Sequence, residues 1–520
     1  MTTPASAQFE NSNDRDKVLL EIQDRVLWLA MQMVHYANKV RPNPDGAKVG
    51  GHQASSASIV TIMTALYFDY MKAGDKISVK PHASPVFHAI QYLLGNLEAS
   101  YLKGLRAFHG LQSYPSRTKD PDGVDFSTGS MGLGAVAPNF AALVHEYIRT
   151  HDFASGPSHR YISLVGDAEL DEGAVWEAIA EPAMNGLDNI LWVVDFNRQS
   201  LDRVIPGIRY QSWKDMFSAN GWQVVAAKYG TRMQAAFAEP HGELLRQCID
   251  ELSNEAYQRL LRLSPAELRK WLPLKSGYPR EMSELISRRD DRELQDLFRN
   301  LGGHDFAELR KAFAQADEAA GPRVVFAYTL KGWMLPSVGH PQNHSVLLTA
   351  EQMEELRNSL GITAEEIWSG FHPQTPAGLL CREASLRLKS PSHPPTPRKE
   401  SVFPTSLHSS FSGKTSTQQT FGLILTSIAR DLPDLAKRVV TVSPDVASST
   451  NLGGWINKVH VWGRKEKEPL PEETEPTALK CRESPIGQHI ELGISENNLF
   501  MALGQLGLSH ELAGELIYPI

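Results

Sequence analysis

Short apolar runs alternate with helical patterns along much of the chain, and this alternation is the feature that most limits its fold. We predict buried strands at residues 161–165, 190–195, 222–226 and 323–329, and helices at 16–38, 55–71 and 172–184. Strands that alternate with helices form a parallel sheet with helices on both faces. The sequence therefore predicts a doubly wound α/β domain, in which ligands bind at the carboxyl ends of the strands.

A stretch rich in proline and serine, residues 386–416, separates two predicted domains. We predict that residues 1–385 form the first domain and that charged helices at 240–320 elaborate it. A helix at 421–430 and a strand at 438–442 begin a second domain at 417–520, also of α/β type. About 100 residues lies at the lower end of the range for a domain. We therefore expect the second domain to be incomplete and the chain to be truncated at its C-terminus.

The charge balance argues against some classes of partner. The chain has 52 Lys and Arg against 60 Asp and Glu, a net charge of −8, and no long basic run, so we expect neither nucleic acid nor a membrane as a partner. No apolar stretch approaches about 20 residues, and the polar N-terminal segment lacks a signal-peptide core. Three widely spaced cysteines match no metal-ligand pattern; we expect Cys248 in a helix core, and Cys381 and Cys481 in loops. These features predict a reduced, cytoplasmic protein.

Polar residues follow two of the predicted strands. Asp167 comes directly after one strand, and Asn197 follows the next after an interval of 30 residues, enough for one helix and a return strand. A right-handed crossover would bring both strand ends to one edge of the sheet. A carboxylate, an amide oxygen and a backbone carbonyl suit Mg²⁺, which also binds phosphate oxygens. We favour a metal that anchors a diphosphate; the alternative is that Asp167 only caps a helix starting near Glu172.

These two segments, Gly-Asp-Ala-Glu-Leu-Asp-Glu from Gly166 and Asn-Arg-Gln-Ser-Leu-Asp from Asn197, resemble the thiamine diphosphate fingerprint of the transketolase superfamily. They are most similar to the homodimeric pyruvate dehydrogenase decarboxylase component, although Ala168 replaces the usual second glycine. Further similar segments follow in the same order at residues 50–55, 82–85, 113–115, 130–134, 302–305 and 330–332. The resemblance implies a thiamine diphosphate-binding fold followed by a second domain of the same type.

The resemblance also implies roles for individual residues. Mg²⁺ would be held by Asp167, Asn197 and the carbonyl of Gln199. Thiamine diphosphate would contact Ser55, Tyr114, Met131, Gly166, Glu169 and Lys331. Substrate or diphosphate would face His52, His82 and His344. For each histidine a structural hydrogen bond is the alternative, and nearby His340 could replace His344. Where the family has Gln-Gly before the counterpart of His82, this chain has Lys80-Pro81.

In the second domain, the run from Gly493 to Glu496 resembles a Gly-Ile-x-Glu segment of the family. By that resemblance, Glu496 would hydrogen-bond the aminopyrimidine ring of the cofactor, and Asp445, at its own strand end, would be its neighbour. A buried carboxyl beside a ring nitrogen can share a proton at neutral pH. The alternative is that Glu496 only lies at the N-terminus of a helix over 498–506, where a carboxylate favours the helix dipole.

The resemblance implies decarboxylation of pyruvate or a related 2-oxoacid with thiamine diphosphate and Mg²⁺, followed by acyl transfer to a lipoyl carrier. It also implies a homodimer with the cofactor between subunits, and the lipoyl acyltransferase of a 2-oxoacid dehydrogenase complex as a partner. One alternative is a transketolase that moves a two-carbon ketol unit between sugar phosphates. Such a site favours a cluster of Arg and His for the phosphate, and the sequence shows no convincing one. Another alternative is a non-catalytic protein that retains the cofactor site.

Overall fold

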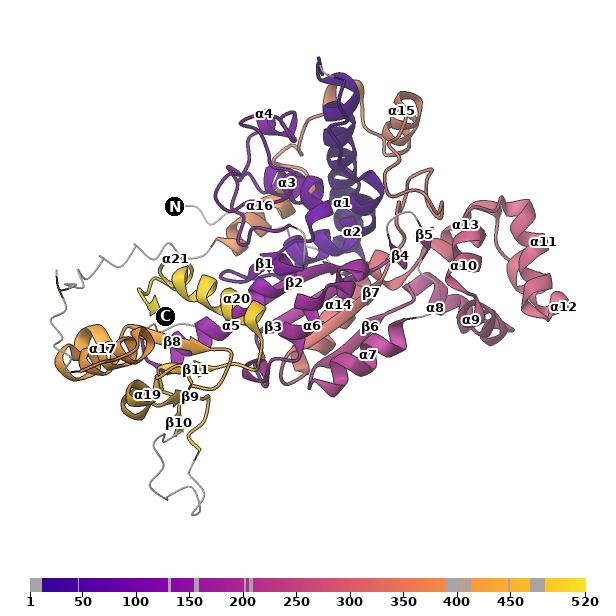
Figure 1. Ribbon diagram of the computed structural model, residues 1–520. Helices are drawn as coiled ribbons and strands as arrows, with labels where there is room; N and C mark the ends of the chain where they lie inside the picture. Colours follow the sequence, from indigo (N-terminus) through magenta and orange to yellow (C-terminus); the bar gives the residue numbers. More distant parts are fainter. Residues whose placement is uncertain are drawn as a thin grey trace. The chain divides into compact units, whose positions relative to one another are not determined.

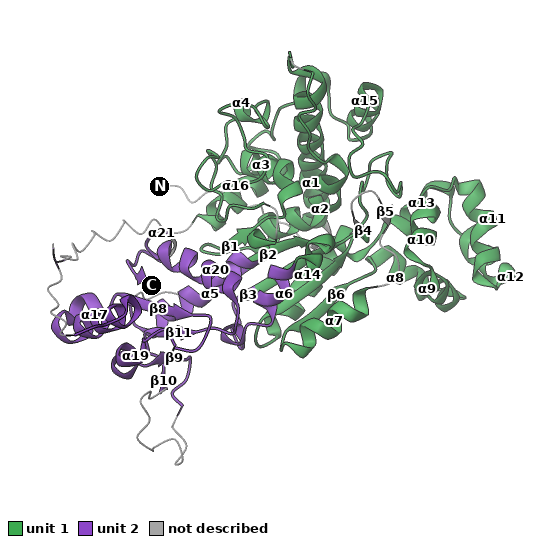
Figure 2. Ribbon diagram, viewed as in Figure 1, with its two compact units in different colours: residues 1–135, 162–172, 191–390 green, residues 136–161, 173–190, 391–520 purple. Residues whose placement is uncertain are grey.

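The computed structural model describes residues 12–44, 46–129, 132–153, 159–200, 203–204, 209–389, 404, 406, 413–447, 449–467 and 482–520. The chain divides into two compact units, coloured separately in Figure 2. Unit 1 comprises residues 1–135, 162–172 and 191–390, and unit 2 comprises residues 136–161, 173–190 and 391–520. Each unit contains one five-stranded sheet. The proposed domain boundaries at 385 and 417 remain a prediction, and most of the intervening stretch lies outside the described residues.

The sheet of unit 1 has the strand order β1-β2-β3-β7-β6 (Figure 1). Its strands are β1 (Lys76–Ser78), β2 (Tyr161–Gly166), β3 (Ile190–Phe196), β6 (Gln223–Ala227) and β7 (Arg323–Tyr328). β3 pairs with β7, and β7 with β6, in parallel. The four predicted strands are confirmed. Sequence analysis missed β1, because three residues are too few to show a periodic pattern.

Alternate side chains of β3 pack on opposite faces of this sheet. Leu191 and Val193 share a hydrophobic core with residues of α1 (Ser12–His35), α2 (Gln53–Ala65) and α14 (Phe306–Glu318). Trp192 and Phe196 instead face α7 (Tyr210–Ala219), with ring centroids 6.1 Å from Phe217 and 5.9 Å from Trp213, respectively. Helices thus cover both faces, and the predicted doubly wound α/β fold is confirmed.

Several helices differ in length or burial from expectation. The predicted helix at 172–184 ends early, because α6 spans Gly173–Ile179 and Pro182 opens a separate 3-10 turn. Cys248 is buried as expected, but Cys381 is also buried, in α16 (Pro376–Leu388), so its placement in a loop was wrong. Cys481 lies outside the described residues.

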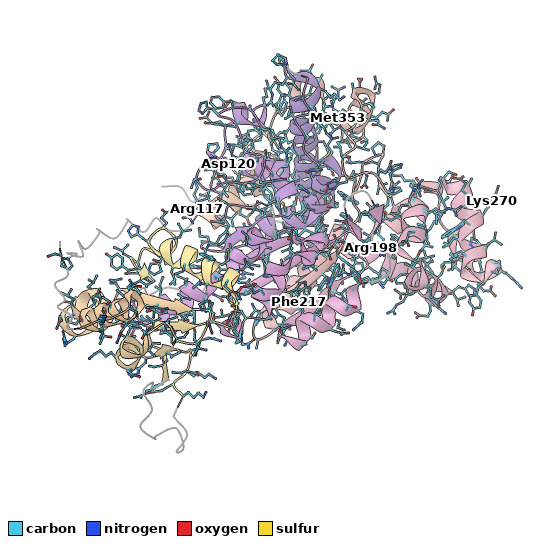
Figure 3. All side chains as sticks on the ribbon, viewed as in Figure 1. Arg117, Asp120, Arg198, Phe217, Lys270 and Met353 are labelled. Carbon is cyan, nitrogen blue, oxygen red and sulfur yellow. The ribbon has the colours of Figure 1, made fainter. Side chains whose placement is uncertain are left out.

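Residues 240–320 are largely helical and belong to unit 1. Between β6 and α14 the chain forms α8 (Thr231–Phe237), α9 (Gly242–Glu251), α10 (Asn254–Leu260), α11 (Pro265–Ser276), α12 (Pro279–Ser287) and α13 (Asp291–Arg299). Amphipathic sequences explain these helices; in α13, for example, Leu294, Leu297 and Phe298 are buried while charged residues face solvent. Figure 3 labels Lys270 in α11 and Arg198, which follows β3 in the same unit.

The sheet of unit 2 has the order β10-β9-β11-β8-β12. Its strands are β8 (Val439–Ser443), β9 (Val461–Trp462), β10 (Glu483–Ser484), β11 (His489–Glu491) and β12 (Tyr518–Pro519), all paired in parallel. α17 (Thr417–Asp431) and α19 (Gly453–Val459) share one core, in which Trp455 is fully buried. The predicted helix at 421–430 and strand at 438–442 are confirmed. Within the described ranges, no helix has both the length and the apolarity needed to cross a bilayer.

Candidate active site at the strand ends of unit 1

Several side chains converge on the buried carboxylate of Asp195, near the carboxyl end of β3. Because side chains alternate along a strand, Asp195 lies on the same face as Val193 and points to α2. Ser58 of α2 donates to Oδ2 at 2.6 Å, Lys80 forms an ion pair with the same oxygen, and Thr329 donates to Oδ1. Burial opposes ionisation, but Lys80 and the donors outweigh it and hold the pKa of Asp195 below its usual value. Asp195 is therefore a fixed anion in the site.

Lys80 is the residue at which the sequence departs from the family pattern. Its side chain is buried and passes close to Gly166, since a Cβ added to that glycine would lie 3.8 Å from the Lys80 Cδ. Its positive charge lowers the pKa of both Asp167 and Glu169, against the larger effect of burial. Sequence analysis missed the Lys80–Asp195 pair because the two residues are 115 positions apart and neither is distinctive alone.

Asp167 lies at the end of β2 with its carboxylate buried. Its Oδ2 accepts the backbone N–H of Arg198 at 2.6 Å, which links the end of β2 to the turn after β3. Burial, and then the charge of Asp195, raise the pKa of Asp167 to about 7. Asp167 begins a 3-10 turn (Asp167–Asp171). Its carboxylate bonds to the turn after a neighbouring strand, whereas in the alternative it would only cap the next helix.

Asn197 and Gln199 complete the predicted metal ligands. The Asn197 Oδ1 accepts the N–H of Gln199 at 3.1 Å, and the Gln199 side chain is bonded to the carbonyl of His340 and to Asn343. Because the Gln199 side chain makes these bonds, the predicted metal ligand of this residue is its backbone carbonyl. A buried carboxylate whose pKa is raised by burial fits a divalent cation, and carboxylate, amide and carbonyl oxygens suit Mg²⁺. The donor set therefore fits the implied metal.

Two further predicted cofactor residues, Glu169 and Ser55, follow β2 and lie in α2, respectively. The Glu169 Oε2 accepts the N–H of Gly166 at 2.7 Å, and burial raises the pKa of Glu169 to about 7. Ser55 is buried in the first turns of α2, and its carbonyl lies 3.0 Å from the Ser58 hydroxyl. Met131 lies outside the described residues.

The three predicted histidines form one cluster with Lys331. The ring centroid of His52 lies 4.0 Å from that of His82 and 4.4 Å from that of His344. The His52 Nδ1 donates to the His344 carbonyl at 2.9 Å, so in the neutral ring Nε2 is left as an acceptor. The Lys331 Nζ lies 3.0 Å from the His344 Nδ1, and the ring of Tyr114 lies 5.9 Å from that of His82. His340 is exposed, so His344 is the histidine that joins the cluster.

His52 and His82 of the cluster are neutral, but cations lie close to them. Burial lowers the pKa of His52 and His82, and nearby positive charges, including Lys331, lower both further. A pKa lowered in this way keeps both rings unprotonated at neutral pH. The three rings have nitrogens within 4.8 Å of one another, a spacing that could hold a metal ion. The charges of Lys331 and Arg106 oppose a cation there and favour an anion.

The expectation that the chain has no convincing Arg/His cluster was therefore wrong. The members of the Arg/His cluster come from four separate segments, around residues 52, 82, 106 and 331–344, which only the fold brings together. Nothing in the local sequence around any one of them reveals the others. The loop that carries Arg106 was not singled out at all.

Buried residues that sequence analysis did not assign hold the Lys331 loop in place. The His304 Nε2 accepts the N–H of Leu330 at 2.8 Å, and its ring stacks on Trp333 with centroids 4.6 Å apart. The Asn343 Nδ2 donates to the Lys331 carbonyl at 3.0 Å. Gly303 allows the close approach of this turn, since an added Cβ would lie 2.6 Å from a backbone oxygen of β7. These contacts position Lys331 beside the histidines.

Arg198, between two predicted metal ligands, connects the strand ends to the helical region. Its φ of 63° lies in the left-handed region that most side chains avoid. Its guanidinium lies 4.8 Å from the ring centroid of Tyr257 in α10 and 5.7 Å from that of Tyr328 in β7. Cation–π contacts of this kind stabilise a fixed arginine, so α10 supports the turn that carries Asn197 and Gln199.

In unit 2, the loop before Glu496 is tightly held while Glu496 itself is exposed. The buried Glu181 accepts the N–H of Gly493 at 3.2 Å, the hydroxyl of Ser495 at 3.1 Å and the amide of Asn498 at 2.9 Å. Glu496 is the first residue of α20 (Glu496–Gly507), so its alternative role at a helix N-terminus stays open.

Asp445, the predicted neighbour of Glu496, is also exposed, and its Oδ1 accepts the N–H of Val446 at 2.6 Å. It follows β8, which pairs with β11, the strand that precedes Glu496. The two residues thus follow adjacent strand ends of the unit 2 sheet. That they act as neighbours at the cofactor remains a prediction.

Comparison with known proteins agrees with this geometry. Residues 58–239 match the family described as "Transketolase, thiamine diphosphate binding domain". The solved structures of transketolase from Leishmania mexicana and from Campylobacter jejuni share the fold, with TM-scores of 0.64 and 0.60 and sequence identities of 16% and 17%. They are matched over 96% and 97% of this chain, and over 63% and 64% of their own chains. The fold and the matched region therefore define a protein similar to the thiamine diphosphate-dependent transketolase superfamily.

Within that class, the curated relatives are pyruvate dehydrogenase E1 components. The relative from Cupriavidus necator is 26% identical over 95% of this chain, and that from Corynebacterium glutamicum is 27% identical over 100% of it. The predicted resemblance is confirmed. The chain spans 57% and 59% of the lengths of these two relatives.

Proposed function

We propose that this chain takes part in thiamine diphosphate- and Mg²⁺-dependent decarboxylation of a 2-oxoacid such as pyruvate, as a pyruvate dehydrogenase E1-like enzyme. The observation that carries the proposal is the convergence of Asp167, Asn197 and Lys331 at neighbouring strand ends, within a chain that matches a thiamine diphosphate binding domain. In such an enzyme the acyl unit passes to a lipoyl carrier, which makes a lipoyl acyltransferase the expected partner. A cytoplasmic location remains a prediction.

Several residues of unit 1 would together bind the cofactor. Asp167, Asn197 and the Gln199 carbonyl would hold Mg²⁺ and through it the diphosphate. Lys80, already paired with Asp195, and Lys331 add positive charge near the anionic group. Thiamine diphosphate, when bound, would supply a carbon nucleophile and an electron sink for C–C cleavage.

The histidines would manage protons and position the substrate. His52 is fixed by its hydrogen bond to the His344 carbonyl, which leaves Nε2 able to accept a proton. Burial lowers the pKa of His52 and His82 and keeps both rings neutral at pH 7, so each presents a ring nitrogen that can accept a hydrogen bond.

We propose further that the active form is a homodimer. In unit 2, Glu496 is exposed between Ile494 and Phe500, which are 86% and 70% exposed. Large apolar side chains this exposed mark an interaction surface. A second copy would cover them and desolvate Glu496, as the proposed contact with the aminopyrimidine ring requires. Sedimentation at graded concentrations tests this: a monomer at all concentrations would contradict it.

Calorimetry and a turnover assay test the proposed function together. Titration of thiamine diphosphate with and without Mg²⁺ should show binding that depends on the metal. Turnover of pyruvate, followed with an artificial electron acceptor, should then release CO₂ only when both are present. Absence of metal-dependent binding would refute the proposed site, whereas binding without turnover of any 2-oxoacid would favour a non-catalytic protein.

Ketol transfer is the second candidate, because the Lys331–histidine cluster with Arg106 offers the cationic site that a sugar phosphate needs. Transfer of a two-carbon unit from xylulose phosphate to an aldose phosphate separates the candidates. Activity in this assay alone, with no decarboxylation, would replace the first proposal by the second.

A further inference from the structure

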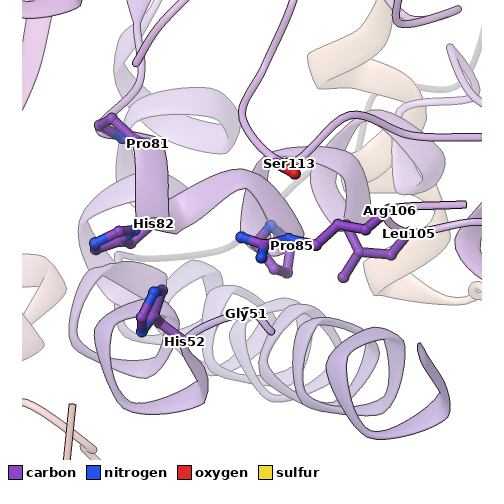
Figure 4. A pocket seen from close by; sticks show the side chains of 8 residues that line it. All are labelled: Gly51, His52, Pro81, His82, Pro85, Leu105, Arg106 and Ser113. Carbon is purple, nitrogen blue, oxygen red and sulfur yellow. The ribbon is translucent and has the colours of Figure 1, made fainter. Parts of the chain in front are cut away.

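A small cavity opens beside the histidine cluster in unit 1 (Figure 4). It encloses about 210 Å³, including the part open to solvent. Its polar lining comes from His52, His82, Arg106 and Ser113, and its apolar lining includes Pro81 and Pro85. The cavity therefore adjoins the rings proposed to face the substrate, and Arg106 gives it a positive charge.

The loop around Arg106 is built to direct this side chain inward. Arg106 has a φ of 56°, in the left-handed region that most side chains avoid. Its N–H donates to the Leu111 carbonyl at 2.8 Å, and the Leu111 N–H donates to the Gly104 carbonyl at 3.0 Å. Phe108, at the tip of the loop, is 91% exposed. Backbone strain of this kind persists where the surrounding structure enforces it, often at ligand sites.

The Arg106 guanidinium has few partners for a charged group that is half-buried. Its Nη1 donates to the Val49 carbonyl at 3.1 Å, and its charge lies 5.9 Å from the ring centroid of Tyr114. Burial lowers the pKa of Arg106, and the Tyr114 hydroxyl partly opposes this effect. By contrast, Arg310 in the same unit pairs with Asp16 at 2.7 Å and with Asp69 at 2.8 Å.

Figure 4 shows the Arg106 side chain extending from its loop toward Pro85, on the side of the two histidines. Its charge contributes to the lowered pKa of His52, so the guanidinium lies close to that ring. A guanidinium has five N–H donors in a planar fork, and among the described residues the bond to the Val49 carbonyl uses one of them, which leaves donors for a ligand. Such a group is suited to a carboxylate or phosphate.

The reacting carboxylate of a 2-oxoacid is a poor ligand for Arg106. That carboxylate loses its charge as CO₂ leaves, so a cation bound to it stabilises the substrate more than the transition state and slows the reaction. An arginine beside the reacting centre is therefore better matched to an anionic group that keeps its charge throughout. This argues against the reacting carboxylate as the group for which the cavity is built.

We propose that the cavity is a subsite for a second, non-reacting anionic group of the substrate, bound by Arg106 with Ser113 at its rim. The substrate class is then a 2-oxodicarboxylic acid, whose far carboxylate enters the cavity. This inference rests on the proposed function for the reaction, but the subsite itself binds without turnover. A ketose phosphate offers the same chemistry through its phosphate, and the test separates the two sources.

The experiment measures dissociation constants of matched ligand pairs by ligand-observed NMR, on the full chain with and without thiamine diphosphate and Mg²⁺. The first pair is 2-oxoglutarate and 2-oxopentanoate, in which a carboxylate replaces a terminal methyl group. The second pair is fructose 6-phosphate and fructose. We expect 2-oxoglutarate to bind at least about tenfold more tightly than 2-oxopentanoate, the size expected for a charged hydrogen bond. A smaller ratio is expected for the sugar pair.

Two variants connect the preference to Arg106. Arg106→Gln should reduce the 2-oxoglutarate preference to less than about twofold, and Arg106→Lys should retain part of it. Arg387→Gln is the matched control, because Arg387 is also partly buried in unit 1 and donates to two backbone carbonyls. It should leave the preference unchanged.

Equal affinities within both pairs for the wild-type chain would overturn the subsite, and so would a preference that survives Arg106→Gln. A preference in the sugar pair alone would keep the subsite and replace the carboxylate by a phosphate. These results do not depend on turnover. Failure of the proposed function would instead appear as absence of metal-dependent cofactor binding, or of turnover with any 2-oxoacid, whatever the ratios.

Discussion

The predicted site residues of unit 1 and those of unit 2 differ in burial and in the hydrogen bonds that hold them. In unit 1, Asp195 is buried and held by Ser58, Lys80 and Thr329, and Asp167 is buried and bonded to the next strand end. In unit 2, Glu496 is exposed, although Glu181 fixes the loop before it. Burial and hydrogen bonds fix the position and the charge state of the unit 1 carboxylates. Unit 1 is thus preorganised for its ligand, and the role proposed for Glu496 needs a further surface.

The largest effect should come from breaking the buried pair of unit 1. Lys80→Met leaves the Asp195 carboxylate buried without a cation, so the free energy of unfolding should fall by about 3–5 kcal/mol. Denaturant unfolding followed by tryptophan fluorescence measures this loss. Lys17→Met, which removes an exposed ion pair with Asp14 in the same unit, is the control and should cost less than about 1 kcal/mol. Equal losses in the two variants would show that the buried pair does not support the site.

The next effect tests the binding function of the buried site. Asp167→Ala should weaken thiamine diphosphate binding in the presence of Mg²⁺ by about 100-fold or more, because it removes the only charged ligand. Calorimetric titration measures the affinity. Asp171→Ala is the matched control, since Asp171 follows the same strand but is half exposed and pairs with Arg209 at 2.6 Å. If both variants weakened thiamine diphosphate binding by the same factor, Asp167 would not be a ligand of the metal.

The difference in burial also predicts a difference in pH dependence. Burial and Asp195 raise the pKa of Asp167 to about 7, so below that pH the site holds a proton that Mg²⁺ must displace. Affinity for Mg²⁺ should therefore rise by about tenfold per pH unit between about pH 5 and 7 and then level off. Asp167→Asn should remove this slope, whereas Glu169→Gln and the exposed Glu496→Gln should keep it. A flat profile in the wild-type chain would contradict the assignment of Asp167.

The smallest effect is expected in unit 2 and concerns the loop alone. Glu181→Gln removes the charge from an acceptor of three donors, so the amide of Gly493 should exchange its hydrogen about tenfold faster. Hydrogen exchange resolved by mass spectrometry measures this change. Mg²⁺ affinity should remain that of the wild type. A Glu177→Gln variant, which alters a partly buried acceptor of Asn497, should have the weaker effect of the two.

Much of the fold and part of the site could be predicted from sequence. Periodic apolar runs identified β2, β3, β6 and β7, because buried strands of a parallel sheet are nearly continuous in hydrophobic residues. The crossover rule then placed Asp167 and Asn197 at neighbouring strand ends, as observed. The resemblance named all three histidines of the cluster, and the structure distinguished His344 from His340.

What could not be predicted depends on contacts between distant segments. Lys80 looked only like a departure from a pattern, because its partner Asp195 lies 115 residues away. Arg106 follows no motif, and its inward direction depends on a loop conformation with positive φ. The early end of α6 is different, because it follows from Pro182, a local signal that the sequence does contain.

The most direct test of the central claim is a crystal structure of the chain with thiamine diphosphate and Mn²⁺, in which anomalous scattering locates the ion. We predict one peak between the diphosphate and the side chains of Asp167 and Asn197, with the Gln199 carbonyl as a further ligand. A cofactor bound elsewhere, or an ion that touches neither Asp167 nor Asn197, would contradict the account.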